Sequence, residues 1–374
     1  MGVRTRIAAV AALALAGSVL VAGQADAGHS HGSLKPVATG LDGPRGVSTY
    51  GGKVIYAVTD GSVYATDGRR TFKLGQVPGG FPPAIDTNKW GTTYALTGAG
   101  GEPGQPLTPG SATLFRLRPG KSPVAVADIA AYQQKDPDPY NSDGGPASET
   151  NPYGVAALKD GTVLVADAAG NDLLRVWPNG KIKTVAKLKP RTVKVPSGLP
   201  ARDSEGNPTN LPPAGTPMLA EAVATSVTVG SDGYWYVGEL RGFPATPGTS
   251  QIWRIKPGSV GAVCDPAKPY KGDCQRYADG YTSIVDLAGG PRGTLAVVQL
   301  ARNSWFKWEL TQAPSDAIGN LYLQFPGKHH KAGYKKELVR GQLTLPGGTA
   351  FNRWGDLFVS APVFGPGAVY KVRF

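Results

Sequence analysis

A hairpin pattern that recurs along the chain constrains its fold more than any other feature. Its clearest copy, Asn151–Val176, carries alternating apolar residues on both sides of Asp160-Gly161 and ends in a further apolar run. Alternation is typical of a strand with one buried face, and Asp-Gly is typical of a tight hairpin turn. Counted from Gly161, an apolar residue lies six positions before it (Val155) and another lies four positions after it (Val165). This stretch therefore predicts three consecutive antiparallel strands.

The same spacing recurs around five other glycines, one residue shorter at the first and loosest at the last: Gly52, Gly91, Gly233, Gly293 and Gly355. Six copies of about 40–70 residues each are typical of a β-propeller, because a four-stranded blade buries its two faces only against neighbouring blades. We therefore predict an all-β fold, a six-bladed β-propeller. A seven-bladed ring and a two-sheet sandwich are the alternatives that the pattern leaves open.

The two ends of the chain are predicted to meet in the last blade. The chain ends on a third strand, Ala368–Phe374, and Leu34–Thr39 precedes the first copy of the repeat. We expect this N-terminal segment to supply the missing fourth strand and to close the ring. In the fifth blade, the aromatic run Ser304–Trp308 is expected to form the third strand. The predicted blades are 43–78, 80–130, 151–188, 222–262, 281–343 and 345–374 with 34–41.

The N-terminus has the three parts of a secretory signal peptide. Arg4 and Arg6 form the charged start, Ile7–Gly23 is the apolar core, and Ala25-Asp26-Ala27 is a small-residue cleavage site. We expect cleavage after Ala27 and a secreted or extracytoplasmic protein; an uncleaved membrane anchor is the alternative. The predicted organisation is a signal peptide (1–27), a flexible tail (28–33) and a single propeller (34–374).

The mature chain is predicted to be basic. The full chain has a formal net charge of +12, and removal of Arg4, Arg6 and Asp26 with the signal peptide leaves +11. A positive excess favours an anionic environment such as cell-wall polymer or lipid head groups. Because the basic residues are spread along an exported chain, we expect no nucleic-acid binding. We expect a monomer whose partner is a small molecule or a protein, with anionic cell-wall polymer as a further candidate.

The two cysteines of the chain, Cys264 and Cys274, lie ten residues apart. An even number of cysteines in an exported chain is typical of a disulfide framework. We therefore predict one disulfide that pins a local loop, with two free thiols as the alternative.

Polar residues at one mouth of the central channel are the candidates for ligand binding. In a propeller, the start of each inner strand and the end of each second strand lie at the same mouth, where ligands commonly bind. Asp167 and Glu239 follow the second strands of two adjacent predicted blades. The candidate residues are Arg45, Asn151, Tyr153, Asp167, Asn171, Asp172, Thr225, Glu239, Asp286 and Gln299.

Two interpretations of these residues compete. In one, Asn151, Asp167 and Glu239 supply oxygen ligands to a divalent cation, calcium or similar, which would polarise an ester, lactone or phosphate. In the other, these side chains hydrogen-bond neighbouring blades and cap turns. No histidine falls on the repeat, and the chain has no GxSxG, HExxH or P-loop motif. A Ser-His-Asp triad is therefore not available at the channel mouth.

Two insertions carry charge clusters of their own. The first surrounds Gly144-Gly145 and has the oxygen-bearing residues Asp136, Asp138, Asn141 and Asp143. Their spacing differs from that of an EF-hand, so the segment is either a calcium loop of another kind or a solvated loop over the channel mouth. The second is the densest basic cluster of the chain and is either a site for anionic polymer or a solvated insertion. It comprises Lys328, His329, His330, Lys331, Lys335, Lys336 and Arg340.

Several of these motifs resemble one known family. NPYGVA, LVADAAGNDLLRV, VATSVTVGSDGYWYVGEL and YTSIVDLA are similar to the ScyD/ScyE family of exported bacterial proteins, which is named for members encoded with scytonemin-pigment biosynthesis and is related to NHL-repeat propellers. The resemblance covers nearly the whole mature chain and is most specific at Asn151–Val176 and Val223–Pro244. It implies a six-bladed propeller outside the cytoplasm, without an established activity.

Two functional hypotheses follow from the sequence. The first is an exported propeller that acts as a ligand- or partner-binding scaffold of the ScyD/ScyE type. The second is a metal-dependent hydrolase, of the lactonase or strictosidine-synthase-like kind, that uses the carboxylates at the channel mouth. The two differ in whether Asp167, Glu239 and Asn151 can converge on one point.

Overall fold

The computed structural model describes residues 32–100 and 107–374. The expected signal peptide, Met1–Ala27, and positions 28–31 of the expected tail lie outside the described residues. Ser33, at the end of the expected tail, already pairs with Arg373.

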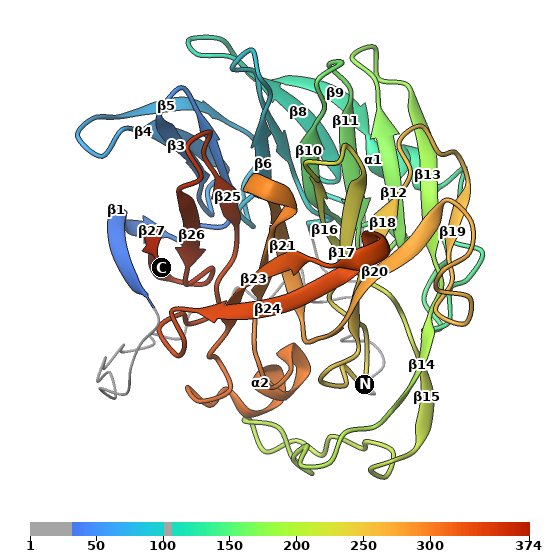
Figure 1. Cartoon of the computed structure of the whole chain (residues 1–374). Helices are drawn as coiled ribbons and strands as arrows, with labels where there is room; N and C mark the ends of the chain where they lie inside the picture. The colour runs from blue at the N-terminus through green and yellow to red at the C-terminus, as the bar shows by residue number, and fades with distance from the viewer. Residues whose placement is uncertain (1–31, 101–106) are drawn as a thin grey trace.

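Six sheets of at least four strands form the blades of a β-propeller, as the sequence predicts (Figure 1). From the inner to the outer strand, the first three blades are β2 (Val47–Tyr50), β3 (Lys53–Ala57), β4 (Ser62–Thr66) and β5 (Thr71–Gln76); β6 (Ala84–Thr87), β7 (Thr93–Leu96), β8 (Thr113–Leu117) and β9 (Val124–Asp128); and β10 (Pro152–Ala157), β11 (Val163–Asp167), β12 (Asp172–Val176) and β13 (Ile182–Leu188). The last three blades are β16 (Ala224–Val229), β17 (Trp235–Glu239), β18 (Ser250–Ile255) and β20 (Cys274–Tyr281); β21 (Ile284–Gly289), β22 (Leu295–Gln299), β23 (Asn320–Pro326) and β24 (Ala332–Leu338); and β25 (Thr349–Phe351), β26 (Leu357–Ala361), β27 (Pro366–Arg373) and β1 (Ser33–Asp42).

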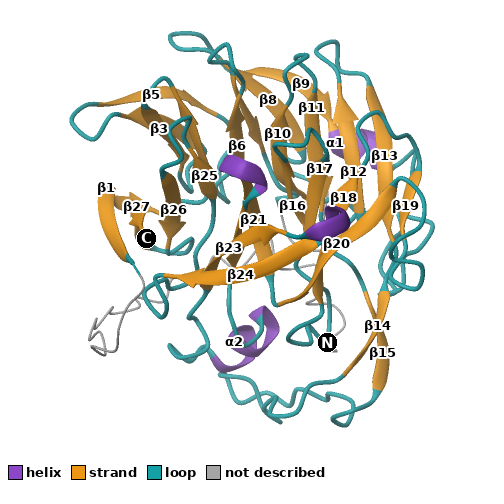
Figure 2. Ribbon diagram, viewed as in Figure 1, coloured by secondary structure: helices purple, strands orange, loops and turns teal. Residues whose placement is uncertain are grey.

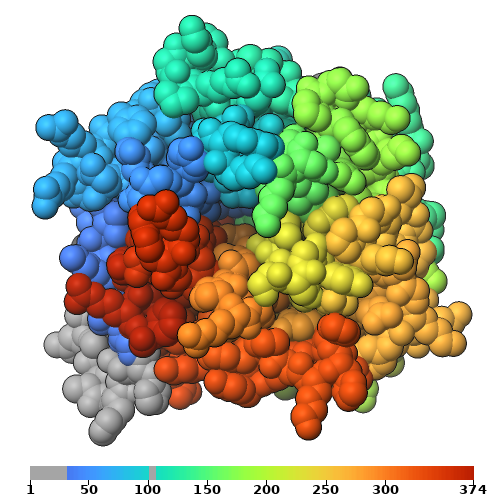
Figure 3. All heavy atoms as spheres, turned by 45° about the horizontal axis from the view of Figure 1, so that its top comes forward, coloured from blue at the N-terminus to red at the C-terminus, as the bar shows by residue number. Residues whose placement is uncertain are grey.

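The ring closes where the prediction places the closure. The N-terminal strand β1 pairs antiparallel with the C-terminal strand β27, so the last blade contains both ends of the described chain. Each inner strand contacts the inner strands of the blades before and after it, and β25 of the last blade contacts β2 of the first. Figure 3 shows the blades following one another around the ring, from blue to red.

Apolar residues at the predicted spacing form the core, which lies between the blades. Val155 and Val165 pair across β10 and β11 and pack with Leu96 and Leu114 of blade two. The connection between the two strands is longer than the expected two-residue turn, because residues 158–162 form it and Leu158 N–H donates to Thr162 O (2.8 Å). Gly161 alone in this connection has a positive φ (87°). The glycine is therefore required, as predicted, but the turn type differs.

Close approach of inner strands explains a second glycine. A Cβ atom on Gly154 would lie 2.7 Å from the Cα atom of Ser226 in blade four. This separation is too short for any side chain, so Gly154 lets β10 and β16 pack backbone to backbone. The glycine of the NPYG motif therefore serves ring packing.

The fifth blade differs from its prediction. Ser304–Trp308 is not the third strand; Trp305–Thr311 forms the helix α2, and β23 is the third strand (Figure 2). The Ser304 hydroxyl accepts a hydrogen bond from Lys307 N–H (3.4 Å), so Ser304 is the N-cap of α2. Trp305 and Phe306 are buried. The prediction was wrong because an aromatic run was taken as a strand, whereas a capping serine begins a short helix there.

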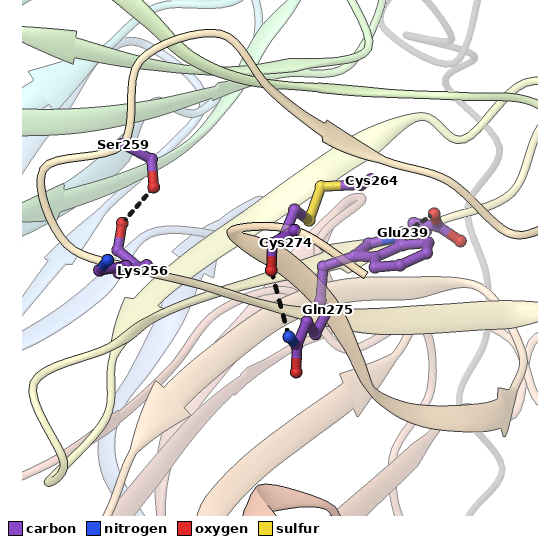
Figure 4. Close-up of a disulfide and its surroundings, with 8 residues drawn as sticks. Glu239, Lys256, Ser259, Cys264, Cys274 and Gln275 are labelled. Carbon is purple, nitrogen blue, oxygen red and sulfur yellow. Dashed lines mark hydrogen bonds between the residues drawn. A yellow bond between two sulfur atoms is a disulfide. The ribbon is translucent and has the colours of Figure 1, made fainter. Parts of the chain in front are cut away.

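The predicted disulfide is present and joins two blades. Cys264 ends the short strand β19 (Ala262–Cys264), which adds to blade three in parallel with β13, and Cys274 begins β20, the outer strand of blade four (Figure 4). Blade four therefore extends beyond its predicted end at 262, because the chain first visits blade three. Blade three has five strands for the same reason.

Some further elements lie outside the blades. They are the helix α1 (Ile129–Gln133) and the hairpin of β14 (Arg191–Lys194) and β15 (Pro217–Ala220). Figure 1 shows this hairpin and α2 at the lower end of the molecule, opposite the hairpin turns at the upper end. In the described part of the chain, α1 and α2 are short, and no helix is both long and apolar enough to span a bilayer.

Candidate functional site

Arg45 occupies the centre of the predicted channel mouth. Its guanidinium donates to Pro82 O (3.0 Å) before blade two and to Tyr153 O in blade three, and it lies 3.6 Å from the centre of the Tyr153 ring. Blades one and three are not neighbours, so the side chain must cross in front of blade two near the ring axis. Arg45 is 5% exposed. The carbonyl oxygens and the aromatic face compensate its charge, and the side chain connects three blades.

The helix α2 covers this mouth with aromatic side chains. Trp305 Nε1–H donates to Arg241 O in blade four (2.9 Å), while Trp308 stacks on Phe364 beyond β26 of blade six. The Phe364 ring in turn lies 6.4 Å from that of Phe81, beside Arg45. Packed aromatic rings therefore lie over this mouth, which the sequence did not reveal because the aromatic run was assigned to a strand.

Asp167 is a structural carboxylate of blade three. Its Oδ1 accepts hydrogen bonds from the backbone N–H groups of Asn151 (2.7 Å), Gly170 (3.1 Å) and Ala169 (3.2 Å), and its Oδ2 accepts one from the Thr150 hydroxyl (2.5 Å). Burial raises the pKa of Asp167, and these donors oppose the shift. The carboxylate thus holds the loop after β11 against the start of β10.

Asp172 begins β12 and lies in a second buried group. Gln133 of α1 donates through Nε2 to Asp172 Oδ2 (3.0 Å) and to Asp167 Oδ2 (3.2 Å). Burial, together with the nearby Asp167 carboxylate, raises the pKa of Asp172 well above its usual range. Asp172 Oδ1 and Gln133 Oε1 are buried without a hydrogen-bond partner among the described residues.

Asn171 connects blade three to two insertions. Its Nδ2 donates to Asp138 Oδ2 (3.1 Å) and Glu221 Oε2 (2.8 Å), while its Oδ1 accepts from Val223 N–H (2.7 Å). Ser142 donates to Glu221 through its backbone N–H (2.5 Å). Burial raises the pKa values of Asp138 and Glu221. Asp138 is 3% exposed, so this residue belongs to a buried network and not to a solvated loop.

Glu239 forms a buried ion pair within blade four. Its carboxylate accepts from the Arg241 guanidinium, from Trp253 Nε1–H (2.5 Å) and from Gln251 N–H (3.2 Å). Burial raises the pKa of Glu239, and the Arg241 charge is the largest influence that opposes it. Because an arginine stays charged in proteins, the pair is ionic. Both Glu239 oxygens are therefore occupied.

Two of the other predicted residues, Thr225 and Asp286, hold neighbouring blades together. The Thr225 hydroxyl donates to Ile284 O in the next blade (2.6 Å), and Asp286 accepts from Thr349 N–H in the blade after that (2.7 Å). Burial raises the pKa of Asp286 to about 7. Gln299 is buried at the end of β22.

Sequence reasoning missed one carboxylate with the same role. Asp86 in β6 accepts from the Ser48 hydroxyl of blade one (3.0 Å) and from Ala157 N–H of blade three (2.8 Å). It directly follows Ile85, the apolar residue of the repeat in blade two. The sequence signal that could have identified Asp86 is an acidic residue inside an inner strand. Such a carboxylate is buried and needs hydrogen-bond donors from neighbouring strands.

The described structure offers little support for a cation at this mouth. Within residues 32–100 and 107–374, no group of three or more His, Cys, Asp or Glu side chains is arranged to hold a metal ion. Asn151 Oδ1 accepts from Ala99 N–H (3.2 Å) in blade two. A cation bound by Asn151, Asp167 and Glu239 would have to displace the donors that these oxygens already have.

An open hollow of about 440 Å³ lies on the outer side of blade three, away from the channel. We call it the outer hollow. Its walls come from the loop after α1, from β13 and from β19. The residues that line it are Tyr132, Asp136, Pro139, Tyr140, Lys183, Thr184, Lys187, Val260, Gly261, Ala262 and Val263.

A basic surface spans the outer strands of blades four and five. Lys331 Nζ lies 4.1 Å from the centre of the Tyr270 ring, so the β23–β24 hairpin tip meets the loop that the disulfide closes. Tyr270 and Tyr334 are 49% and 67% exposed. We call this the basic surface; its exposed lysines without an ion pair among the described residues are Lys268, Lys271, Lys328, Lys331 and Lys336.

Comparison with solved structures supports the fold. No protein-family model matches the sequence, and no curated protein matches it either. The PQQ-bound aldose sugar dehydrogenase of Streptomyces coelicolor is similar in structure, with 13% identity, a TM-score of 0.52 and coverage of 92% of this chain and 98% of that chain. A glucose dehydrogenase is similar with 11% identity, a TM-score of 0.54 and coverage of 91% and 99%. At such identities the likeness establishes the β-propeller fold and nothing finer.

Proposed function

We propose that this protein is a non-catalytic exported propeller of the ScyD/ScyE type, which binds an anionic polymer of the cell envelope through the basic surface. The observation that carries the proposal is the meeting of the blade-five hairpin tip and the disulfide-closed loop at Tyr270. The five lysines of the basic surface, which have no ion pair among the described residues, lie on the same two segments as the exposed rings of Tyr270 and Tyr334.

The charge of this surface favours an anionic ligand. Asp279 is neutralised by Arg191 (2.8 Å) and Arg276 (3.0 Å), so it does not offset the lysines nearby. Unpaired lysines on an outer wall attract a flexible polyanion without the desolvation that a buried ion pair requires. The tyrosine rings add apolar faces that can contact the carbon backbone of such a polymer.

The channel mouth supports a non-catalytic role. Hydrolysis by a bound metal needs open coordination positions and ligand oxygens that are free to bind. Asp167 and Glu239 instead accept hydrogen bonds on both oxygens, and α2 covers the mouth above Arg45. The hydrolase hypothesis would require these contacts to open.

The test is the binding of purified protein to poly(glycerol phosphate), measured by calorimetry at low and at physiological salt. We expect affinity to fall with salt, because exposed charges are screened. The variant K328Q/K331Q/K336Q is expected to bind about tenfold more weakly, since three surface charges contribute roughly 0.5 kcal/mol each. The matched control is K121Q/K159Q/K181Q, which removes the same charge from exposed turns of blades two and three.

Equal losses of affinity in the two triple variants would mean that net charge alone governs binding. If the wild-type protein does not bind the polymer, an anionic polymer is excluded as its ligand. Metal analysis and assays of lactone and phosphotriester turnover run beside it. A stoichiometric metal, with turnover lost in Glu239→Gln, would replace this proposal with the hydrolase.

A further inference from the structure

Two segments that the ring does not need build the outer hollow. The helix α1 contributes Tyr132, and the loop after it contributes Asp136 and Tyr140. The opposite wall is β19, which joins blade three from a distant part of the chain. Figure 1 shows β19 beside β13 at the outer edge of this blade. The volume of about 440 Å³ lies within the usual range of small-molecule sites, roughly 300–1,000 Å³.

The disulfide and one ion pair hold these walls in place. Cys264, the last residue of β19, is bonded to Cys274 of blade four. Lys189 Nζ lies 3.0 Å from Asp265 Oδ2, next to this disulfide, and 5.0 Å from the centre of the Tyr140 ring. The two walls are therefore connected to each other and not only to the blade.

The charges at the base of the hollow are already paired. Lys187 Nζ lies 3.3 Å from Asp136 Oδ2 and donates to the carbonyl oxygens of Asp136 (3.0 Å) and Pro137 (3.1 Å). Its ammonium group is thus committed to the protein. A ligand that carried a strong charge would have to compete with this pair, so the base favours a neutral molecule.

Three polar groups that line the hollow have capacity to spare. No hydrogen bond among the described residues engages Asp136 Oδ1, the Tyr140 hydroxyl or Lys183 Nζ. Asp136 Oδ1 can accept a hydrogen bond, Lys183 Nζ can donate one, and the Tyr140 hydroxyl can do both. Of the other lining residues, Thr184 and Lys187 are polar and already paired with Asp136. The remainder are apolar or aromatic: Tyr132, Pro139, Val260, Gly261, Ala262 and Val263.

We propose that the outer hollow binds a single sugar ring or a similar neutral cyclic polyol. Adjacent hydroxyls of such a molecule donate to Asp136 Oδ1 and accept from Lys183 Nζ, while its C–H face lies against the tyrosine and valine walls. This site is separate from the basic surface and does not depend on polymer binding there.

Saturation-transfer NMR tests the proposal with glucose, galactose, mannose, N-acetylglucosamine and myo-inositol, each titrated against the intact protein. At least one is expected to give a saturable signal with a dissociation constant on the order of 1–10 mM, as suits a ligand of this size. Asp136→Asn is expected to weaken binding about fivefold, and Tyr140→Ala or Val263→Trp to abolish it. Asp67→Asn, the same change in an exposed turn of blade one, is the matched control.

The disulfide supplies an independent readout. Replacement of both cysteines by alanine is expected to weaken binding of the same sugar at a temperature where the variant is still folded, because β19 loses its anchor. The Val263→Trp variant is a second test in which loss of binding would not come from unfolding, because the new side chain fills the hollow and Val263 is an exposed residue.

The proposal is overturned if none of the five probes gives a saturable signal. It is also overturned if the signal persists unchanged in Tyr140→Ala and Val263→Trp, since the sugar would then bind elsewhere. The triple lysine variant of the basic surface is expected to retain sugar binding, so failure of either proposal leaves the other to be judged on its own measurement.

Discussion

At the channel mouth, the Glu239 carboxylate accepts three hydrogen bonds, one of them from its ion-pair partner Arg241. In the outer hollow, by contrast, one oxygen of Asp136 has no hydrogen-bond partner among the described residues. The first carboxylate is completely buried and the second is about one-third exposed. Both belong to polar clusters beside blade strands. Only the second still has hydrogen-bonding capacity to offer.

This difference shows why a polar residue at a channel mouth can serve the fold instead of a ligand. Inner strands approach closely in a small propeller, so polar groups near the axis are desolvated and must be satisfied inside the protein. The outer edge of a blade meets solvent. Insertions there can leave polar groups open at little cost in stability. The two regions should therefore respond differently to substitution.

The largest effect is expected for Glu239→Gln. The substitution keeps the size of the side chain but leaves the Arg241 charge buried and unpaired, which costs about 3–5 kcal/mol. Urea unfolding measures the loss. Asp160→Asn, which breaks the exposed pair with Arg175, is the control and should cost less than about 1 kcal/mol. Equal small losses would show that the mouth carboxylate is not structural.

Loss of the disulfide is expected to have the next largest effect. Cys264 and Cys274 are ten positions apart, and closing a loop of this length contributes about 2–3 kcal/mol. The double alanine variant should unfold at lower urea concentration by this amount, and reduction of the wild type should reproduce the change. A variant with wild-type stability would mean that β19 is held by its strand pairing alone.

Asp286 predicts a dependence of stability on pH. Its folded-state pKa is about 7, above the unfolded value, so the folded state binds the proton more tightly. The free energy of unfolding should therefore fall as the pH rises from about 4 to about 7, by at most about 1.4 kcal/mol per pH unit from this group. Asp286→Asn removes this contribution. Parallel pH profiles of the two proteins would contradict the assignment.

The smallest effect on stability is expected in the outer hollow. Asp136→Asn keeps an acceptor for the Thr184 hydroxyl and loses a partly exposed pair with Lys187, so it should cost less than about 1 kcal/mol. Thermal unfolding checks this value on the same sample that is used for sugar titration. A large loss of stability would place Asp136 with the structural carboxylates of the mouth.

Much of the fold could be predicted from local pattern. The spacing around Gly161 identified the strands that pair Val155 with Val165, and the end of the chain on a third strand identified β1 as its partner. The aromatic run after Ser304 was assigned wrongly, because apolar side chains alone do not distinguish a buried strand from a short capped helix.

The candidate site was less accessible to sequence reasoning. The predicted positions of Asp167, Glu239 and Asp286 were tied to the repeat, but their partners come from loops, insertions and the next blade. Nothing in the order of residues indicated that Arg45 would reach Tyr153. The outer hollow was not expected, since β19 and the loop after α1 are more than a hundred residues apart.

The sequence by itself predicted the six-bladed ring, the N-terminal strand that closes it and the disulfide, because strand periodicity, turn glycines and paired cysteines are local signals. Only the tertiary structure decided which polar side-chain atoms have no hydrogen-bond partner among the described residues. That outcome depends on which donors the folded chain brings to each oxygen, and those donors lie far away in sequence. Asp167 and Asp136 are both aspartates near blade three. Only the fold shows that the Asp167 carboxylate holds two strands of the blade together, whereas the Asp136 carboxylate faces the outer hollow.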